Sequence, residues 1–184
     1  MSLISQAESM TAEVLKLYIR SIPDFPRKGV NFRDISPLLA NPVARIAVVQ
    51  RLSVGIKRPD AVIGIESRGF IIGIMLADYW RVPFIMARKK DKLPGSKIAQ
   101  SYSLEYGEEI MEMQVDALKP GQWVVIADDL LATGGTVHAC IRLVQQCQAS
   151  VEAVVCLIEL KGLEGRDILA GYKVHTVISF DVNA

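Results

Sequence analysis

The sequence predicts an α/β fold whose central sheet is mostly parallel and flanked by helices. Short apolar runs typical of buried strands alternate along the chain with stretches whose apolar residues recur at helical spacing, and the sequence contains no internal repeat. The length of 184 residues suits one domain with a full hydrophobic core. We therefore expect a single domain over residues 1–184.

The first part of the chain predicts helices around an ordered loop. Residues 7–20 place apolar side chains at the spacing of a helix. Two prolines and a glycine in SIPDFPRKGVNFRD (residues 21–34) then exclude a long helix and indicate a loop. A second helix is expected from about Pro42 to Ile56, with Asn41 as its N-cap.

The rest of the chain predicts strands and helices in alternation. Strands are expected at residues 61–66, 82–89, 123–129, 151–160 and 173–179, with Asp128 and Asp129 as the carboxyl end of the third, and helices within 67–80 and 135–149. The segments SYSLEY and EEIMEMQV alternate like antiparallel strands around Gly107, which predicts a hairpin that stands off the parallel sheet. Since ligands bind beyond the carboxyl ends of parallel strands, we expect the functional site at that edge.

The charge balance excludes partners that need a strongly charged protein. The 21 lysine and arginine residues nearly match the 20 acidic residues, for a net charge of +1. Nothing global therefore points to nucleic acid, to an anionic membrane or to a polyanionic partner. Apolar runs such as residues 70–77 are far shorter than the roughly 18 residues of a membrane span, and the N-terminus lacks a signal-peptide pattern. We expect a cytoplasmic protein.

The cysteines and histidines predict neither a disulfide framework nor a zinc site. The three cysteines form no CxxC pair and are odd in number. Cys140 and Cys147 share the apolar face of the predicted helix, so we interpret them as buried structural thiols. The two histidines, His138 and His175, have no neighbouring cluster of metal ligands. We expect His138 to be exposed on a helix.

The stretch VVIADDLLATGGT (residues 124–136) predicts a site for a sugar phosphate. Its loop ATGGT would present backbone N–H groups and two hydroxyls at a helix N-terminus, where an anion is favoured. The adjacent acids, Asp128 and Asp129, suit vicinal sugar hydroxyls or a magnesium ion with its waters. A phosphate beside a diol is a ribose 5-phosphate. An ordinary capped helix would leave the second acid unexplained, and the nucleotide motifs GxxxxGK[ST] and GxGxxG are both missing.

This stretch resembles the phosphoribosyl-pyrophosphate signature of type I phosphoribosyltransferases, in the form seen in adenine phosphoribosyltransferases. Other blocks resemble the same family in its order: IPDFPRKGVNFRDISPLL (22–39), GIESRGFIIG (64–73), RKKDKLPG (88–95), SYSLEYG (101–107) and LIELKGLEGR (157–166). The resemblance covers nearly the full chain. It implies the type I phosphoribosyltransferase fold, with a small N-terminal helix and base-recognition hood at about residues 1–40 and a lid hairpin at about 90–115.

The resemblance also implies a reaction and its partners. The phosphoribosyl group of phosphoribosyl pyrophosphate would pass to adenine, giving AMP and pyrophosphate in purine salvage, with Mg²⁺ as cofactor and a homodimer as the assembly. The 5-phosphate loop would be Ala132, Thr133, Gly134, Gly135 and Thr136. Asp128 and Asp129 would form the ribose and magnesium environment, with magnesium reached through substrate and water and not by direct protein ligands.

The pyrophosphate would lie between a turn and a basic cluster. The resemblance assigns Ser67, Arg68, Gly69, Arg88, Lys89, Lys92 and Tyr106 to it, and in the family the ESRG turn often carries a non-proline cis peptide. On the residues alone, ESRG also reads as an ordinary turn with Ser67 as a helix cap, and the basic cluster as a solvated face. Asp91 stands where the family more often has glycine, which bears on the flexibility of that loop.

Catalysis and base choice rest on the lid and the hood. The resemblance makes Glu105 the group that manages the proton of the purine imidazole edge, although a structural cross-strand pair is the alternative. It assigns Val30, Asn31, Phe32, Arg33 and Leu160 to adenine, with Phe32 stacked on the ring. On the residues alone, Phe25 and Phe32 are equally well hydrophobic plugs under the loop.

Two other functions would use a similar phosphoribosyl-pyrophosphate pocket. A 6-oxopurine phosphoribosyltransferase would use a similar sugar-phosphate site, but FPRKGVNFRD and the lid glutamate disfavour it. A non-catalytic regulator could keep the phosphoribosyl-pyrophosphate pocket as a sensor. Such a regulator would be expected to lose the lid chemistry or to carry a nucleic-acid-binding face, and the sequence indicates neither.

Overall fold

The structure is a computed structural model that describes residues 2–104 and 107–182. It divides into two compact units, Met1–Val54 and Gly55–Ala184. The α/β prediction is confirmed, because the larger unit contains a mixed sheet with helices. That the whole chain acts as one domain stays a prediction.

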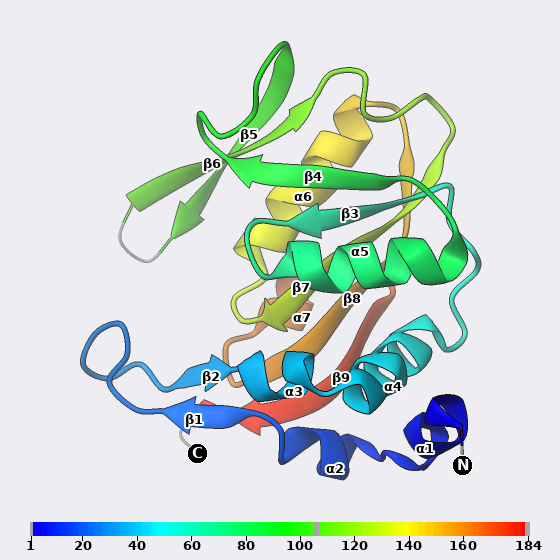
Figure 1. Cartoon of the computed structure of the whole chain (residues 1–184). Helices are drawn as coiled ribbons and strands as arrows, with labels where there is room; N and C mark the ends of the chain where they lie inside the picture. Colours follow the sequence, from blue (N-terminus) through cyan, green and yellow to red (C-terminus); the bar gives the residue numbers. More distant parts are fainter. Residues whose placement is uncertain (1, 105–106, 183–184) are drawn as a thin grey trace. The chain divides into compact units, whose positions relative to one another are not determined.

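The N-terminal unit pairs short helices with a two-stranded antiparallel sheet (Figure 1). Its elements are α1 (Leu3–Ser9), α2 (Ala12–Lys16), β1 (Arg20–Ile22), β2 (Phe32–Asp34), α3 (Ser36–Ala40) and α4 (Pro42–Ser53). Asn41 caps α4 as predicted, because its side-chain oxygen accepts hydrogen bonds from the N–H groups of Val43 at 2.9 Å and Ala44 at 3.2 Å.

The single helix predicted over residues 7–20 is wrong. The chain forms two short helices instead, with Met10 in an extended conformation between them. Thr11 starts the second helix, since its hydroxyl accepts a hydrogen bond from the N–H of Val14 at 3.2 Å. In a continuous helix, the N–H groups after Thr11 would bond to carbonyls of the preceding turn. The threonine side chain takes the place of such a carbonyl, so capping of the second helix competes with continuation of the first.

The C-terminal unit is built on a seven-stranded sheet in the order β5-β6-β4-β3-β7-β8-β9. Its strands are β3 (Ala61–Ile65), β4 (Phe84–Lys89), β5 (Lys97–Leu104), β6 (Gly107–Gln114), β7 (Trp123–Leu131), β8 (Ser150–Lys161) and β9 (Val174–Asp181). Strands β4, β3, β7, β8 and β9 run parallel, and β5 and β6 form the predicted antiparallel hairpin. The prediction of a mostly parallel sheet is confirmed.

The hairpin joins the edge of the sheet. β6 pairs with β4 at Arg88 and Lys89, and the N–H of Lys90 donates to the carbonyl of Ile110 at 3.0 Å, so the hairpin continues the sheet over a short stretch (Figure 1). Helices α5 (Gly69–Trp80) and α6 (Gly135–Gln146) cover opposite faces of the sheet, and α7 (Gly165–Ile168) is a single turn between β8 and β9.

The central strands β3 and β7 carry the core of this unit. Residues 61–65 and 124–127 are buried, as the continuous apolar runs predicted. Cys140 and Cys156 are buried free thiols, whereas Cys147 is only partly buried. His138, predicted to be exposed, is also partly buried. In residues 2–104 and 107–182, no helix has the length and apolarity that crossing a bilayer requires.

Strand β7 is longer than predicted. It continues to Leu131, because its pairing with β8 extends to Leu131 opposite Glu159. Asp128 and Asp129, predicted at the carboxyl end of the strand, therefore lie just before its last two residues. Helix α6 starts at Gly135, so only a three-residue turn separates the strand from the helix.

Candidate active site

A cavity of about 340 Å³ lies at the carboxyl ends of β3, β4 and β7. It brings together residues from the ESRG turn, the basic cluster, the hairpin and the sugar-phosphate motif: Glu66, Ser67, Arg68, Lys89, Tyr102, Glu109, Asp128, Asp129, Leu130, Ala132 and Thr136. A smaller cavity of about 60 Å³ shares four of these residues and adds Thr133 and Gly134. Blocks that the sequence placed at one sheet edge thus face a common space.

The 5-phosphate loop, residues 132–136, leads directly into helix α6. Gly134 precedes the helix with a φ of +82°, and its carbonyl accepts the N–H of His138 at 2.9 Å. As the N-cap residue, Gly134 has no side chain with which to cap the helix. Its first N–H groups therefore remain available, and together with the helix dipole they favour an anion in the small cavity.

The two acids stand beside the start of helix α5. A Cβ on Gly69 would lie 2.8 Å from Asp128 Oδ1 and 2.9 Å from the carbonyl of Ala127, so only glycine permits this approach. Asp128 Oδ1 also accepts the N–H of Asp129 at 2.8 Å. Burial and the charge of Asp129 raise the pKa of Asp128 well above its usual value.

Arg68 neutralises the second acid. Its Nη2 lies 2.9 Å from Asp129 Oδ2, and the Asp129 side chain is only 8% exposed. The contact has the distance of an ion pair but not the alignment of a hydrogen bond, since that oxygen accepts none. Burial raises the pKa of Asp129, and the Arg68 charge acts against that rise. The predicted ribose acids and a predicted pyrophosphate cation therefore share one cavity.

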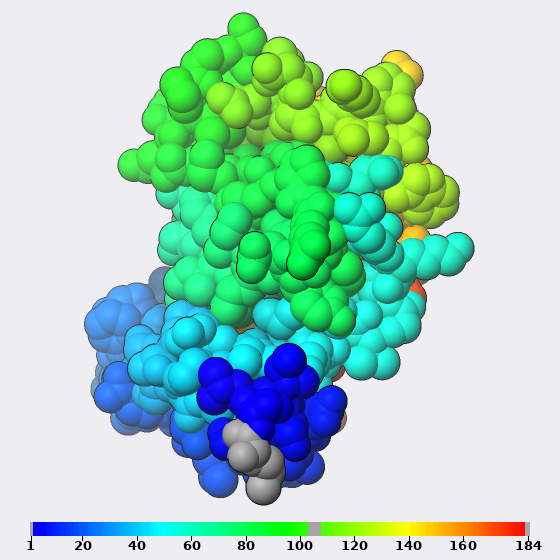
Figure 2. Space-filling view, turned by 45° about the vertical axis from the view of Figure 1, so that its right-hand side comes forward, coloured from blue at the N-terminus to red at the C-terminus, as the bar shows by residue number. Residues whose placement is uncertain are grey.

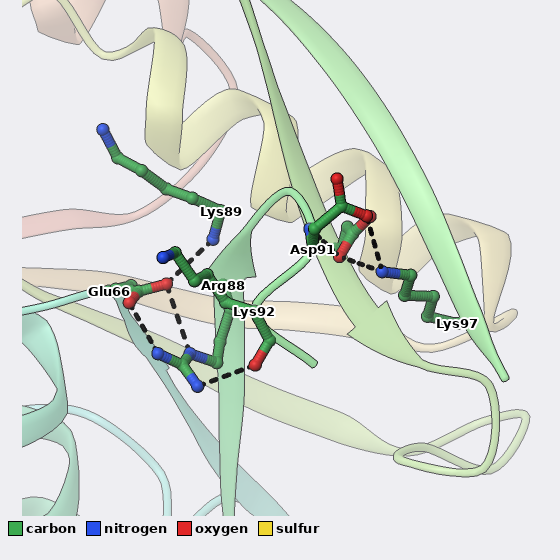
Figure 3. A network of polar contacts seen from close by, with 7 residues as sticks. Glu66, Arg88, Lys89, Asp91, Lys92 and Lys97 are labelled. Carbon is green, nitrogen blue, oxygen red and sulfur yellow. Dashed lines mark hydrogen bonds and ion pairs between the residues drawn. The ribbon is translucent and has the colours of Figure 1, made fainter. Parts of the chain in front are cut away.

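The ESRG turn is tied to strand β4 through Glu66, as Figure 3 shows. The Glu66 carboxylate accepts hydrogen bonds from Arg88 Nη2 at 2.7 Å, from Arg88 Nε at 3.2 Å and from the N–H of Lys89 at 3.0 Å. These donors lower the pKa of Glu66. The peptide between Glu66 and Ser67 is cis, as the family resemblance implied.

The predicted basic cluster divides into different roles. Arg88 is held by Glu66 and also donates to the carbonyl of Lys92 at 2.8 Å. Lys89 lines the cavity, where its Nζ lies 3.0 Å from Glu109. Neither Arg88 nor Lys92 lines the cavity. The assignment of all three to pyrophosphate stays a prediction.

The turn after β4 is fixed to the hairpin by Asp91. The backbone of Asp91 is left-handed, with a φ of +62°, a conformation that glycine adopts freely and aspartate tolerates. Its N–H donates to Glu112 at 3.0 Å, and Lys97 Nζ donates to the same carboxylate at 2.8 Å (Figure 3). The aspartate that replaces the family's more usual glycine therefore keeps the backbone shape of a glycine turn.

Tyr102 and Glu109 are site residues that the sequence did not predict. They face each other across β5 and β6, and the Tyr102 hydroxyl donates to Glu109 at 2.7 Å. Burial and the hydrogen bond to Glu109 raise the pKa of Tyr102. Hydrogen bonds from Tyr102 and Lys89 lower the pKa of Glu109. A hairpin centred on Gly107 would set Tyr102 opposite Glu112, so the predicted pattern did not identify this pair. The observed register, with Leu104 opposite Gly107, brings Tyr102 opposite Glu109.

The predicted lid residues Glu105 and Tyr106 lie outside the described residues. The backbone of Ser103 belongs to β5. The roles that the family resemblance implies for Glu105 and Tyr106 stay predictions.

The predicted base-recognition residues 30–33 belong to the N-terminal unit. Phe32 packs edge-to-face on Phe25, with ring centroids 5.2 Å apart and an interplanar angle of 75°. Arg33 is buried and donates to the hydroxyl of Ser21. The backbone of Val30 is hydrogen-bonded within the loop, where its carbonyl accepts the N–H of Phe25 at 3.2 Å. These contacts fit the plug interpretation of Phe32, and its stacking on a purine stays a prediction.

Leu160 lies in the C-terminal unit beside the 5-phosphate loop. It lines a third cavity of about 360 Å³ that it shares with Leu131, Ala132 and the start of α7. Its predicted contact with adenine stays a prediction.

Comparison with known proteins decides the family. The model of the phosphoribosyl transferase domain family matches residues 35–183. The adenine phosphoribosyltransferase of Carboxydothermus hydrogenoformans is 48% identical over 168 residues, which cover 90% of this chain and 99% of that protein. The chain belongs to the adenine phosphoribosyltransferases. The family that the sequence motifs suggested is thereby confirmed.

Solved adenine phosphoribosyltransferases confirm the fold. That of Rhodothermus marinus has a TM-score of 0.88 and 46% identity, covering 92% of this chain and 98% of that chain. That of Saccharomyces cerevisiae, in complex with D-2,5-dideoxy-2,5-imino-altritol 1,6-bisphosphate and adenine, has a TM-score of 0.84 and 35% identity, covering 90% of this chain and 97% of that chain. The type I phosphoribosyltransferase fold follows from these likenesses.

The contacts of Glu66 generate a testable prediction. Glu66→Gln replaces a carboxylate that accepts three hydrogen bonds by an amide whose NH₂ would face the donors of Arg88. We expect magnesium pyrophosphate to bind about tenfold more weakly, since hydrogen bonds to a charged group are worth about 1.5–3 kcal/mol each. Isothermal titration calorimetry measures this affinity.

Glu108→Gln is the matched control, because Glu108 is an exposed acid on β6 that is absent from the cavity lining. Equal affinities for magnesium pyrophosphate in the two variants would show that Glu66 does not organise the ESRG turn for this ligand.

Proposed function

We propose that the chain transfers the 5-phosphoribosyl group of phosphoribosyl pyrophosphate to adenine, forming AMP and releasing pyrophosphate. One observation carries this conclusion: a single cavity joins an uncapped helix N-terminus, an acid pair and the cations Arg68 and Lys89. These are the groups needed by a 5-phosphate, a ribose diol and a pyrophosphate. The names of the relatives and the adenine bound to the yeast enzyme support the choice of base.

The charges in the cavity suit the departure of pyrophosphate. As the bond from ribose C1 to pyrophosphate breaks, positive charge develops on the ribose and negative charge on the leaving group. Arg68 and Lys89 would stabilise the negative charge, together with backbone N–H groups of the turn at Ser67 and Gly69. Asp128 and Asp129 would hold the ribose hydroxyls and lie near the developing positive charge.

Each cavity cation already has an acidic partner that a substrate could replace. Arg68 pairs with Asp129, and Lys89 pairs with Glu109. Phosphate oxygens would take over the cations, and ribose hydroxyls would donate to the acid released. This exchange keeps buried charges compensated, which lowers the cost of binding a highly charged substrate.

Magnesium is the cofactor we propose. It prefers oxygen ligands and keeps several waters, so the pyrophosphate oxygens, with waters held by the carboxylates of Asp128 and Asp129, would form a suitable donor set. When bound, the ion supplies positive charge to the leaving pyrophosphate. We propose that it is reached through substrate and water near the two acids.

Base recognition would fall to the hood, the lid and Leu160. Adenine offers an amino donor beside a ring acceptor, whereas hypoxanthine and guanine offer an oxygen acceptor beside a ring donor. Backbone groups of residues 30–33 can distinguish adenine from the 6-oxopurines, because they can match one of these patterns and not the other. Phe32 and Leu160 would cover the ring, and Glu105 would handle its imidazole proton. The relatives' names favour adenine over 6-oxopurines and an enzyme over a sensor.

A homodimer is supported by an exposed apolar face of α5. Ile71, Ile74 and Tyr79 are 39%, 50% and 53% exposed and recur at helical spacing. The green segment that contains α5 and β4 lies open on the face seen in Figure 2. An apolar helix face of this kind is typical of a surface that a second copy covers. The cytoplasmic location expected from the sequence stays a prediction.

An activity assay tests the reaction directly. With magnesium and phosphoribosyl pyrophosphate supplied, we expect pyrophosphate release with adenine and far less with hypoxanthine, guanine or xanthine. Release with hypoxanthine but not adenine would contradict the base, and no release with any base would favour the sensor.

The role of Glu105 is tested by Glu105→Gln. We expect kcat to fall about a hundredfold, as general acid–base groups typically contribute at least this much. The affinity for phosphoribosyl pyrophosphate should change little, because the proton is exchanged on the base. Glu108→Gln again serves as control. Equal losses of turnover and sugar affinity would make Glu105 a structural residue.

The dimer is tested by Ile74→Asp. We expect the dissociation constant of the dimer to rise at least about tenfold, because a buried charge replaces an apolar contact at the interface. Sedimentation velocity over a range of concentrations measures it. Ile4→Asp, at an isoleucine of α1 that is 58% exposed, is the control. An unchanged assembly in Ile74→Asp would exclude this face.

A further inference from the structure

The 5-phosphate loop rests on the start of α7, a segment to which the sequence assigned no role. A Cβ on Gly165 would lie 2.1 Å from the carbonyl oxygen of Ala132 and 3.2 Å from the Leu131 side chain. A Cβ on Gly134 would lie 2.7 Å from the carbonyl oxygen of Gly165. Two backbones therefore touch without any side chain between them.

This contact controls the part of the loop that would meet the phosphate. Ala132 and Gly134 line the cavity of about 60 Å³ at the start of α6. The atom nearest to a side chain at position 165 is a backbone oxygen, which cannot rotate away as a flexible side chain can. Any side chain at position 165 must therefore displace the loop, its helix turn or α7 itself.

A network of hydrogen bonds anchors α7 to the sheet. Arg166 donates two hydrogen bonds of 2.7 Å to the carboxylate of Glu159 on β8, in the planar fork that arginine favours. The Thr176 hydroxyl on β9 donates to the same carboxylate at 2.8 Å. Arg166 Nη1 also donates to the carbonyl of Val174 at 3.2 Å. The residue that follows Gly165 is thus tied to two strands.

We propose that Gly165, Arg166 and Glu159 are positioning residues that hold the 5-phosphate loop in its binding geometry. The proposal rests on the proposed function, and it concerns the sugar-phosphate half of that site. Gly165 makes the contact, and the Glu159–Arg166 pair keeps Gly165 in place. None of the three touches the reacting atoms.

The arrangement differs from a feature that only stabilises the fold. The Arg166 side chain is 46% exposed and the Glu159 side chain 14% exposed, and an ion pair with one partner open to solvent adds less to folding stability than a fully enclosed one. Phosphate binding by backbone N–H groups, in contrast, is sensitive to displacements of about 1 Å. Loss of the support should therefore appear in phosphate affinity before it appears in thermal stability.

Three variants test the proposal: Gly165→Ala, Arg166→Lys and Glu159→Gln. Calorimetry measures their binding of ribose 5-phosphate and, separately, of magnesium pyrophosphate. We expect Gly165→Ala to weaken ribose 5-phosphate binding at least about tenfold, with pyrophosphate affinity within about twofold of the unaltered chain. Arg166→Lys keeps the charge but loses the fork, so it and Glu159→Gln should weaken ribose 5-phosphate binding by a smaller factor.

Gly171→Ala is the matched control for the glycine variant. Gly171 has a φ of +90°, and a Cβ at this position would have no neighbouring atom within 4 Å, so alanine there strains the backbone without touching the loop. We expect it to lower the melting temperature and to leave both affinities unchanged. In steady-state assays, Gly165→Ala should raise the KM for phosphoribosyl pyrophosphate and leave the KM for adenine unchanged.

The outcomes separate this proposal from the function. The positioning role would be overturned if ribose 5-phosphate affinity were unaltered in all three variants. It would also be overturned if the affinities for ribose 5-phosphate and for magnesium pyrophosphate fell equally. If Gly165→Ala fails to fold, Arg166→Lys and Glu159→Gln decide the question in the same way. If the unaltered chain binds ribose 5-phosphate but transfers nothing to adenine, the function fails while the affinities still test the support. No ribose 5-phosphate binding by the unaltered chain would overturn both.

Discussion

The parallel pairing of β3 with β4 on one side and β7 on the other is the constraint on which the site depends. Ile65 lies opposite Ala87, and Gly64 lies opposite Ala127, so all three strands reach the same edge of the sheet together. The residues that follow these positions are the ESRG turn, the basic cluster and the acid pair. A shift in register would separate them, because each side chain would then leave the sheet at a different height and on the other face.

Electrostatic compensation shapes what this edge can hold. Arg68 with Asp129, Arg88 with Glu66 and Lys89 with Glu109 pair each cation with a carboxylate. Isolated charges in such a partly buried space would be costly, so the pairs permit a dense cluster of both signs. A substrate that carries phosphates and hydroxyls can exchange with the pairs that line the cavity. The Glu66 carboxylate also lines the cavity, but its partner Arg88 does not, and this pair holds the ESRG turn against β4.

Much of the fold was predictable, because its signals are local. Buried parallel strands appear as continuous apolar runs, and ATGGT between strand and helix predicts an anion site without knowledge of the rest of the chain. The failures have equally local causes. Thr11 divides the first helix by capping the second, and β7 runs past its two acids because β8 continues to pair with it. The spacing of apolar residues carries no information about a capping side chain or about how far a neighbouring strand continues to pair.

The sequence by itself determined the order of the chemical motifs along the chain and the family to which these motifs belong, and it predicted a sugar-phosphate loop. Only the tertiary structure decided which charges neutralise each other, that Tyr102 and Glu109 enter the cavity, and that Gly165 lies against Ala132. The physical reason is distance along the chain. These contacts join residues from separate strands and turns, and their geometry is set by sheet register and close packing, which no short stretch of sequence encodes.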